Sequence, residues 1–509
     1  MAQSSAKFTI LDNVISGRTD SGSAKEISST QEGHLEVALK EPVGAFGEFV
    51  GVNNIPVIQA TAVYGLIPSN FREYTATGGS TGISNRMFTV GNGTSVGGYG
   101  AIQSFRALTY KAGQGAMARF TAVFTNNVAS HWSGVGLVNL SDELSFGYNG
   151  TTFGIWYRTG GAAEVRTITV TGASGGSTNL TLTLNTVGYT IPLTAGTTAH
   201  NAYEIATWLN ANQSVWVADQ IGSTVIISAQ SDGAKSGTYS YSHATSTGTI
   251  VQNTAGVTKT NNHISQASWN VNTYAALDPS KGNVYQIQYQ YLGFGDIYFF
   301  VENESTGHLD LVHIIEYANN YTSPSLTQPA LRFGMYSAST GTTTNVNVQC
   351  ASVGCFTQSG IQNRTRNPRS VKNTQSVTTS FINILTLRNR RTYNYLLNQV
   401  EVNLINLSLS SESTKNVEVE IRVNPTFSGE TNFSNAGTQL VTDIDTTANT
   451  VSGGTLIAAF TIGSSGSLDI DLSSFDIIIP PSLILTISAR VTSGAASNVT
   501  STLTYYEDL

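Results

Sequence analysis

Residues 284–301, VYQIQYQYLGFGDIYFFV, contain two runs in which large apolar side chains occupy every second position. Three glutamines separate the members of the first run, and a glycine-containing turn with Gly293 and Gly295 leads into the second. The alternating apolar residues are Tyr285, Ile287, Tyr289, Tyr291, Ile297, Phe299 and Val301. Alternation with a period of two on both sides of a turn is typical of an antiparallel hairpin with one buried face. We expect this face to need a partner sheet.

Segments of the same type that could supply that partner occur much earlier in the chain. They are ARFTAVF (118–124), ELSFGYN (143–149) and TFGIWYRT (152–159), and each places aromatic or aliphatic residues at alternate positions. A dense series of short strands with glycine turns is typical of an all-β sandwich. The two parts are separated by a segment with a different pattern. The sequence therefore predicts one sandwich that is split by an insertion.

The composition limits the classes of function. The chain has 509 residues, enough for roughly three domains of about 150 residues each. Charged residues make up 11% of it, against about 25% in an average soluble protein. The net charge of −7 argues against binding to nucleic acid or to an anionic membrane. No apolar run has transmembrane length, and the first residues lack the basic-then-apolar order of a secretion signal, so we expect folding in a cytoplasm.

The predicted fold class is mainly β: a concanavalin-A-like sandwich, a small inserted domain, and a second, jelly-roll-like sandwich. The expected boundaries are an extended N-terminal arm (1–60), the first part of the sandwich (61–163), an inserted sheet-plus-one-helix domain (164–261), the second part of the sandwich (262–358), a basic linker (359–372) and the C-terminal sandwich (373–509).

The insertion is predicted to contain a helix because apolar residues follow one another there with helical spacing. Ala202, Ile205, Ala206 and Leu209 lie at i, i+3, i+4 and i+7. Thr197 or Thr198 is expected to cap its start. Strands are expected on both sides of the helix, which makes this segment a compact module. A module of this kind is tolerated within a loop when its ends lie close together.

Two polar segments have alternative interpretations. The arm contains extended apolar pieces around Val37, Phe46, Phe49, Val57 and Ile58. These either pair with the first sheet of their own chain or dock on a neighbouring subunit. The linker TQSGIQNRTRNPRSVKN either is a solvated connection or forms a docking surface for an acidic partner, through Arg364, Arg366, Arg369 and Lys372.

The C-terminal region is predicted to form about eight short antiparallel strands. Residues 417–423 alternate apolar and charged side chains, as in a strand with one face buried. The alternation changes phase near Leu404 and Ile405, which indicates a bulge. TDIDTT (442–447) is predicted to be a loop, and LDIDLSS (468–474) to expose its aspartates on a strand face.

One serine and three pairs of carboxylates are candidates for catalysis. Gly93–Gly97 matches the nucleophile-elbow pattern around Ser95, but GGYG follows it in place of the required helix. Paired carboxylates could serve a glycosidase only if they lay about 5 Å apart in a cleft. These pairs are Asp142/Glu143, Asp443/Asp445 and Asp469/Asp471. None has a convincing context, so the sequence predicts no catalytic, cofactor or metal-binding residue.

The remaining candidates favour structural roles. The histidines lack metal-ligand spacing, and His313 is expected in the core beside Leu311 and Ile315. Their full set is His34, His131, His200, His243, His263, His308 and His313. Cys350 and Cys355 would face opposite sides of one continuous strand and are expected to be buried free thiols. Trp132 and Trp156 either stack on sugar rings or belong to the core.

The segments GQGAMARFTAVF (113–124), FGYNGTTFGIWYRTGG (146–161) and the insertion from Glu164 to Leu209 resemble virion structural proteins of tailed phages and large DNA viruses. The split sandwich resembles the concanavalin-A-like sandwiches of fibres and attachment proteins. The insertion is similar to small modules of phage tail and baseplate proteins. The resemblance covers residues 61–358, while the C-terminal region is similar only to jelly rolls in general. It carries over no catalytic motif and therefore implies no site residue.

Two classes of function remain. The first is a non-enzymatic virion structural protein, such as a minor capsid, vertex, fibre or tail component, assembled in the host cytoplasm. Its expected partners are copies of itself, with a trimer favoured, other virion proteins and a host-surface glycan. No cofactor, nucleic acid or membrane is expected. The second class is a free-standing glycan-binding lectin or adhesin. A secretion signal or an acidic calcium loop would favour the lectin, and neither pattern is found in the sequence.

Overall fold

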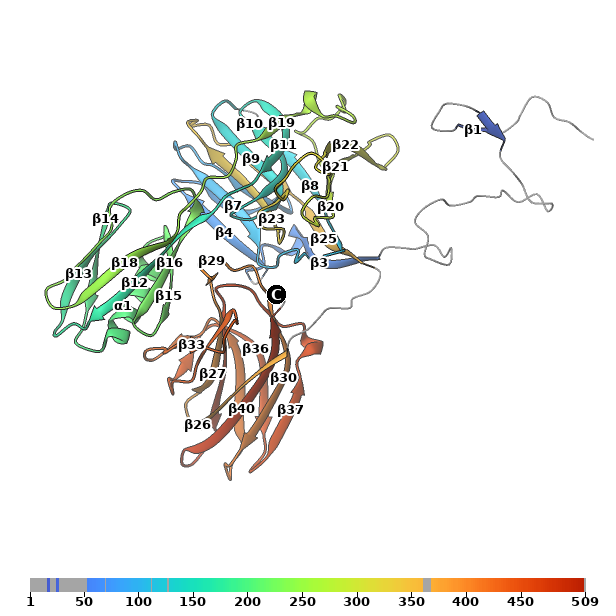
Figure 1. Ribbon diagram of the computed structural model, residues 1–509. Helices are drawn as coiled ribbons and strands as arrows, with labels where there is room; N and C mark the ends of the chain where they lie inside the picture. The colour runs from blue at the N-terminus through green and yellow to red at the C-terminus, as the bar shows by residue number, and fades with distance from the viewer. Residues whose placement is uncertain are drawn as a thin grey trace, which may run out of the picture. The chain divides into compact units, whose positions relative to one another are not determined.

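A computed structural model describes residues 16–18, 24–26, 53–68, 70–110, 112–125, 128–359 and 368–507. Antiparallel sheets dominate, and α1 (Thr198–Asn212) is the α-helix of the described residues (Figure 1). The mainly-β prediction is confirmed. Minor elements are the pair β1 (Ser16–Arg18) and β2 (Ala24–Glu26), and the short 3₁₀ turns η1 (Ala62–Tyr64), η2 (Gln266–Ser268) and η3 (Ser473–Phe475).

The first sandwich consists of two large sheets drawn from both sides of the insertion. One sheet has the order β19 (His263–Ser265), β11 (Thr152–Arg158), β10 (Glu143–Asn149), β9 (His131–Val138), β23 (Arg332–Ser339), β7 (Tyr99–Ser104) and β4 (Phe71–Ala76). The other has the order β22 (Leu309–Ile315), β21 (Ile297–Glu302), β20 (Asn283–Tyr289), β8 (Gly115–Phe124), β24 (Asn347–Cys350), β6 (Met87–Gly91) and β5 (Ser80–Ser84). β25 (Ser352–Ser359) pairs with β8, and β3 (Asn53–Thr61) pairs with β25.

The predicted hairpin at residues 284–301 is confirmed. β20 and β21 pair with Tyr285 opposite Val301 and Ile287 opposite Phe299, and all four side chains are buried. The partner segments divide between the sheets. β8 lies beside β20 in the same sheet, whereas β10 and β11 belong to the facing sheet. A strand with one apolar face can pair edge to edge or pack face to face, so alternation alone does not distinguish these positions.

The two cysteines are buried free thiols, as expected, but their geometry differs from the prediction. β24 ends at Cys350 and β25 begins at Ser352, so the pair does not lie on one continuous strand. The interruption at Ala351 lets both side chains enter the same core. Burial raises the pKa of Cys350 to about 12 and raises that of Cys355 as well.

The last part of the expected arm pairs with its own chain and not with a neighbouring subunit. Residues 53–61 form β3, where Ile58 is buried and Val57 packs against the core of the first sandwich. These two residues therefore have their apolar partners in their own chain. Val37, Phe46 and Phe49 lie outside the described residues.

The inserted segment has its own hydrophobic cluster. Its sheets have the orders β15 (Trp216–Ile221), β16 (Thr224–Asp232), β12 (Ala163–Gly172), β18 (Thr247–Thr254), and β14 (Val187–Leu193), β13 (Thr178–Leu184), β17 (Ser240–Ser242). Ala202, Ile205 and Leu209 of α1 pack into this cluster. Thr197 caps the helix, because its hydroxyl accepts a hydrogen bond from the His200 amide at 3.1 Å. The predicted helix and its cap are confirmed.

The C-terminal region is a second two-sheet sandwich. One sheet contains β26 (Pro368–Val377), β40 (Ser497–Glu507), β30 (Val402–Ser411), β37 (Ser467–Asp471) and β38 (Ile478–Ile479). The other has the order β33 (Ser434–Asn435), β34 (Thr442–Asp445), β27 (Ile382–Asn389), β39 (Ile484–Val491), β31 (Val417–Val423) and β36 (Thr455–Ile462). Two small pairs join β28 (Thr392–Tyr393) to β29 (Leu396–Leu397) and β32 (Thr426–Phe427) to β35 (Val451–Ser452).

Details of this region confirm some expectations and correct others. The register of β30 shifts between Leu404 and Asn406, where the bulge was predicted. The linker prediction of 359–372 is too long, because β26 begins at Pro368 and includes Arg369 and Lys372. Arg364 and Arg366 lie outside the described residues. The loop prediction for TDIDTT is wrong, since its first four residues form β34.

Candidate functional site

The nucleophile-elbow candidate lies in a turn without the required context. Ser95 is exposed between β6 and β7, and a strand follows it. A strained strand-to-helix turn is what presents a nucleophilic serine in such sites. Ser95 therefore lacks the local structure that would activate it.

Asp142 and Glu143 are buried and bonded to the protein. The carboxylate of Asp142 accepts the amides of Thr327 at 2.9 Å and Gln328 at 2.7 Å. Burial raises the pKa of Asp142 to about 6 despite these two donors. Glu143 accepts hydrogen bonds from Ser145 Oγ and Tyr336 Oη and pairs with Arg158 at 3.1 Å. All these partners occupy the oxygens of the two carboxylates, so the pair holds strands together.

Trp132 and Trp156 lie beside this network on the seven-stranded sheet. Trp156 is fully buried and donates to the Ser133 carbonyl at 2.9 Å, so the core interpretation holds for it. Trp132 is half-buried and donates to Asn149 at 3.0 Å, while the Arg158 guanidinium lies 5.2 Å from its ring centroid. Both indole rings therefore pack against other side chains of the protein, and the Arg158 guanidinium lies over each of them.

The two other carboxylate pairs differ from one another. Asp443 is buried between two arginines, 2.7 Å from Arg388 and 3.0 Å from Arg390. Asp445 is also buried, where it accepts a hydrogen bond from Asn383 at 3.0 Å. On β37 the aspartates are exposed, as predicted, and Asp471 accepts from Ser473. Neither pair lines either of the two pockets given for the described residues.

The buried histidines His131 and His313 form hydrogen bonds within the protein. His313 is buried, as expected, and its Nδ1 accepts from the Asn270 amide at 3.1 Å. It does not share a face with Leu311, because a register shift in β22 places His313 opposite Phe299 and Leu311 opposite Phe300. His131 Nε2 lies 2.9 Å from Ser337 Oγ, and burial lowers its pKa to about 4. His34 lies outside the described residues. Within the described ranges, no group of three His, Cys, Asp or Glu residues could hold a metal ion.

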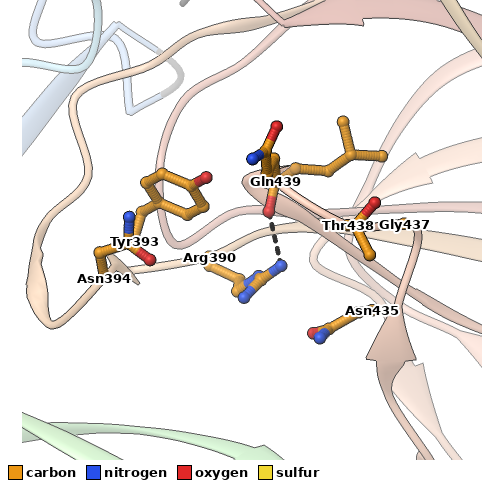
Figure 2. A pocket seen from close by; sticks show the side chains of 8 residues that line it. Arg390, Tyr393, Asn394, Asn435, Gly437, Thr438 and Gln439 are labelled. Carbon is orange, nitrogen blue, oxygen red and sulfur yellow. Dashed lines mark hydrogen bonds between the residues drawn. The ribbon is translucent and has the colours of Figure 1, made fainter.

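A polar pocket of about 570 Å³ lies in the C-terminal sandwich. Two loops form it: the segment that follows β27, and the connection between β33 and β34. Figure 2 shows the side chains that surround it, with Tyr393 and Asn394 on one side and Asn435 and Thr438 on the other. Its lining residues are Arg390, Tyr393, Asn394, Asn435, Gly437, Thr438, Gln439 and Leu440.

Local geometry explains how the chain presents these residues. Asn394 and Tyr395 both have positive φ, 48° and 60°, which makes a two-residue turn between β28 and β29. Gln439 also has a positive φ of 61°. Arg390 fixes the second loop, because its Nη2 donates to the Leu440 carbonyl at 2.6 Å, as drawn in Figure 2. Asp443 lies beside the same guanidinium and balances its charge.

Four polar side chains of this pocket have no hydrogen bond to the described protein residues. They are Asn394, Asn435, Thr438 and Gln439, and all four are exposed. Together they offer three amides and one hydroxyl, each of which can donate and accept. Tyr393 adds a half-buried aromatic ring. The arrangement can form hydrogen bonds to a neutral ligand rich in hydroxyl groups, and it lacks a lining carboxylate for acid–base catalysis.

The sequence analysis did not predict this pocket. The one local signal was Asn394-Tyr395 between two short apolar segments, since asparagine tolerates positive φ in tight turns. The second loop lies about 40 residues later, and only the sheet pairing of β27 with β34 brings the two loops together.

No family model and no curated protein matches this chain. Among solved structures, the Emp47p carbohydrate recognition domain has a TM-score of 0.24 and 10% identity, over 60% of this chain and 96% of that chain. The lectin from Bauhinia forficata in complex with GalNAc has a TM-score of 0.22 and 10% identity, over 61% and 100%. Sulfolobus Turreted Icosahedral Virus has a TM-score of 0.15 and 8% identity, over 87% and 92%. At such low TM-scores these likenesses carry no argument about function.

None of the described helices is both long enough and apolar enough to cross a membrane.

Proposed function

We propose that this protein is a non-enzymatic virion structural protein, a minor capsid, vertex, fibre or tail component, whose C-terminal sandwich binds a host-surface glycan. The observation that carries the binding role is the polar pocket with its four unengaged side chains. Sugar hydroxyls act as both donors and acceptors, as the amide and hydroxyl groups of the pocket do. The low charge content and the resemblance to virion proteins support the particle role.

The proposal of a non-enzymatic role rests on how the candidate groups are used. The carboxylates of Asp142, Glu143, Asp443 and Asp445 are buried in structural bonds. A general acid or base must reach the proton that it transfers in a bound substrate. A glycan that binds in the pocket should therefore be recovered unchanged.

Binding is tested with the full-length protein on a glycan array, followed by calorimetry with the best glycan. The double variant Asn435→Ala/Gln439→Ala should bind about tenfold more weakly, because two hydrogen bonds of about 0.5–1.5 kcal/mol each are lost. Asn179→Ala removes an exposed amide in the inserted segment and should leave the affinity unchanged. Unchanged binding by the double variant, or a glycan that is cleaved during the titration, would contradict the proposal.

The alternative is a free-standing lectin that uses the same pocket. Antibodies against the purified protein separate the two roles. On the particle proposal, the antibodies label intact virions in electron micrographs. Labelling confined to soluble secreted material, together with pocket-dependent glycan binding, would establish the lectin instead.

A further inference from the structure

The four outer strands of the C-terminal sandwich differ in how they are protected against pairing with another strand. β26 starts with a proline and carries Arg369 and Lys372. β37 exposes Asp469 and Asp471, and β33 is only two residues long. Prolines, charges and short length are the usual means by which a sheet edge avoids association. Three of the four outer strands therefore carry a recognisable device.

β36 differs, because its only such device is a bulge at Ile457, and Ala458–Ile462 carries none. Its sequence, TLIAAFTI, has eight residues without a charge, a proline or a glycine. Leu456 is 47% exposed and Ile457 is 38% exposed. Phe460 packs only partly against the core. Within the described part of the chain, β36 pairs with β31 alone, so the backbone groups along its other side have no strand partner.

The surroundings of β36 are electrically balanced. On its outer face the neighbouring residues of β31 are charged, and each charge has an opposite partner. Glu418 lies 2.7 Å from Arg490, and Glu420 lies 2.7 Å from Arg422. A second neutral strand could approach without like-charge repulsion, whereas a strongly charged segment would find no unpaired counter-ion among these four residues. This balance favours a neutral partner.

From these observations we infer that β36 is the contact by which two copies of this chain associate, through antiparallel pairing of β36 with β36 of the second copy. A two-fold contact needs only one self-complementary surface, and a neutral apolar strand is complementary to itself. The register with β31 shifts at Ile457, so the regular part of the strand is Ala458–Ile462 and the contact centres near Phe460. Pairing there would cover Phe460 and complete the backbone hydrogen bonds.

This contact predicts a dimer, or a larger assembly with two-fold symmetry, in place of the trimer expected from the sequence. It does not depend on the glycan pocket, which other strands and loops form. The competing occupants of the edge are residues 1–52 of the same chain or of a neighbour, and an unrelated protein.

The test is sedimentation equilibrium of the full-length chain at micromolar concentration. Wild type should be a dimer, and Ala459→Lys or Thr461→Lys should raise the dissociation constant at least tenfold. Ser467→Lys places the same charge on the exposed edge strand β37 and should leave the mass unchanged. Near-ultraviolet circular dichroism checks that every variant is folded.

Charge reversal gives a second measurement that general loss of stability would not reproduce. An equimolar mixture of Ala459→Lys and Ala459→Glu chains should recover the dimer, because the opposite charges then lie in adjacent strands. Hydrogen exchange of residues 455–462 should slow in the dimer relative to either variant alone. A wild-type monomer, a trimer, or a dimer that is lost on removing residues 1–52 but unaffected by Ala459→Lys would overturn the inference.

Discussion

The first sandwich and the C-terminal sandwich are each built from two antiparallel sheets around one core, but the side chains of the two cores differ. The first core is rich in aromatic rings: Phe146 alone lies within 4.7 Å of Tyr285, 5.6 Å of Phe299 and 6.0 Å of Trp269, centroid to centroid. The second core is almost entirely aliphatic, with Tyr505 as its fully buried aromatic residue. One architecture therefore tolerates two different ways of filling its interior.

The difference has consequences beyond packing. Aromatic and ring-nitrogen groups bring hydroxyls and titratable nitrogens into the first sandwich, where each needs a partner. All five tryptophans, all seven histidines and both cysteines lie before residue 359 in the sequence. Tryptophan fluorescence and thiol labelling therefore report on this part of the chain and not on the C-terminal sandwich.

The largest expected effect is the truncation of Phe146. Phe146→Ala should lower the free energy of unfolding of the first sandwich by about 3–5 kcal/mol, because the ring leaves a cavity among neighbours that cannot collapse fully. Ile487→Val in the C-terminal sandwich should cost only about 0.5–1.5 kcal/mol. Urea titration followed by tryptophan fluorescence and by labelling of Cys350 and Cys355 should show the first loss and not the second. A response of these probes to Ile487→Val, of the size expected for the C-terminal sandwich, would show that the two cores unfold as one unit.

The next largest expected effect is that acid lowers the stability of the first sandwich but not that of the C-terminal sandwich. His131 has a pKa lowered to about 4 by burial, and burial lowers the pKa of His263 and His313 too. These groups bind protons more tightly when unfolded, so the first sandwich loses stability as the pH falls from about 6.5 towards 4, by on the order of 3 kcal/mol for His131. Asp142, with its pKa raised to about 6, opposes this loss because its folded form gains the proton first.

The C-terminal sandwich should respond in the opposite direction. Burial raises the pKa of Asp443 and of Glu507, so the folded state binds these protons more tightly than the unfolded state. Their contribution to stability is present at low pH and is lost as the pH rises through the folded pKa. Hydrogen exchange followed by mass spectrometry at pH 7 and pH 4.5, corrected for intrinsic exchange rates, should show relative loss of protection only in the first sandwich. Equal loss of protection in the two sandwiches would contradict the opposite pH dependence expected for them.

The smallest effect concerns buried hydroxyls. Tyr289 Oη donates to the Pro329 carbonyl at 2.9 Å, and Tyr289→Phe should cost about 1 kcal/mol because that carbonyl loses its partner. Tyr505 Oη lies 2.8 Å from Thr442 Oγ1, which also donates to Glu507. Tyr505→Phe should therefore cost less, since Thr442 keeps a partner. Urea midpoints for the two variants measure the difference, and a greater loss for Tyr505→Phe would reverse the expected order.

Much of the fold followed from local patterns that depend on neighbouring residues alone. The hairpin around Gly293, the α1 stripe with its Thr197 cap and the bulge after Leu404 were all predicted correctly. Each depends on the period of side-chain direction along one segment, which covalent geometry fixes. The loop prediction for TDIDTT failed because the structure of this segment depends on residues far away in the chain. Its aspartates are buried because Arg388 and Asn383, more than fifty residues away, satisfy them there.

By itself, the sequence determined the mainly-β class, the interruption of the first sandwich and the buried state of the two thiols, because alternation and composition set which faces avoid water. The tertiary structure alone decided which strands lie side by side, which carboxylates are buried, which loops form the polar pocket and which outer strand is left without protection. Those features depend on contacts between residues far apart in the chain. Alternation with a period of two predicts that a strand has a buried face. Only the assembled sheets determine which residues pack against that face and which strand, if any, pairs with each edge.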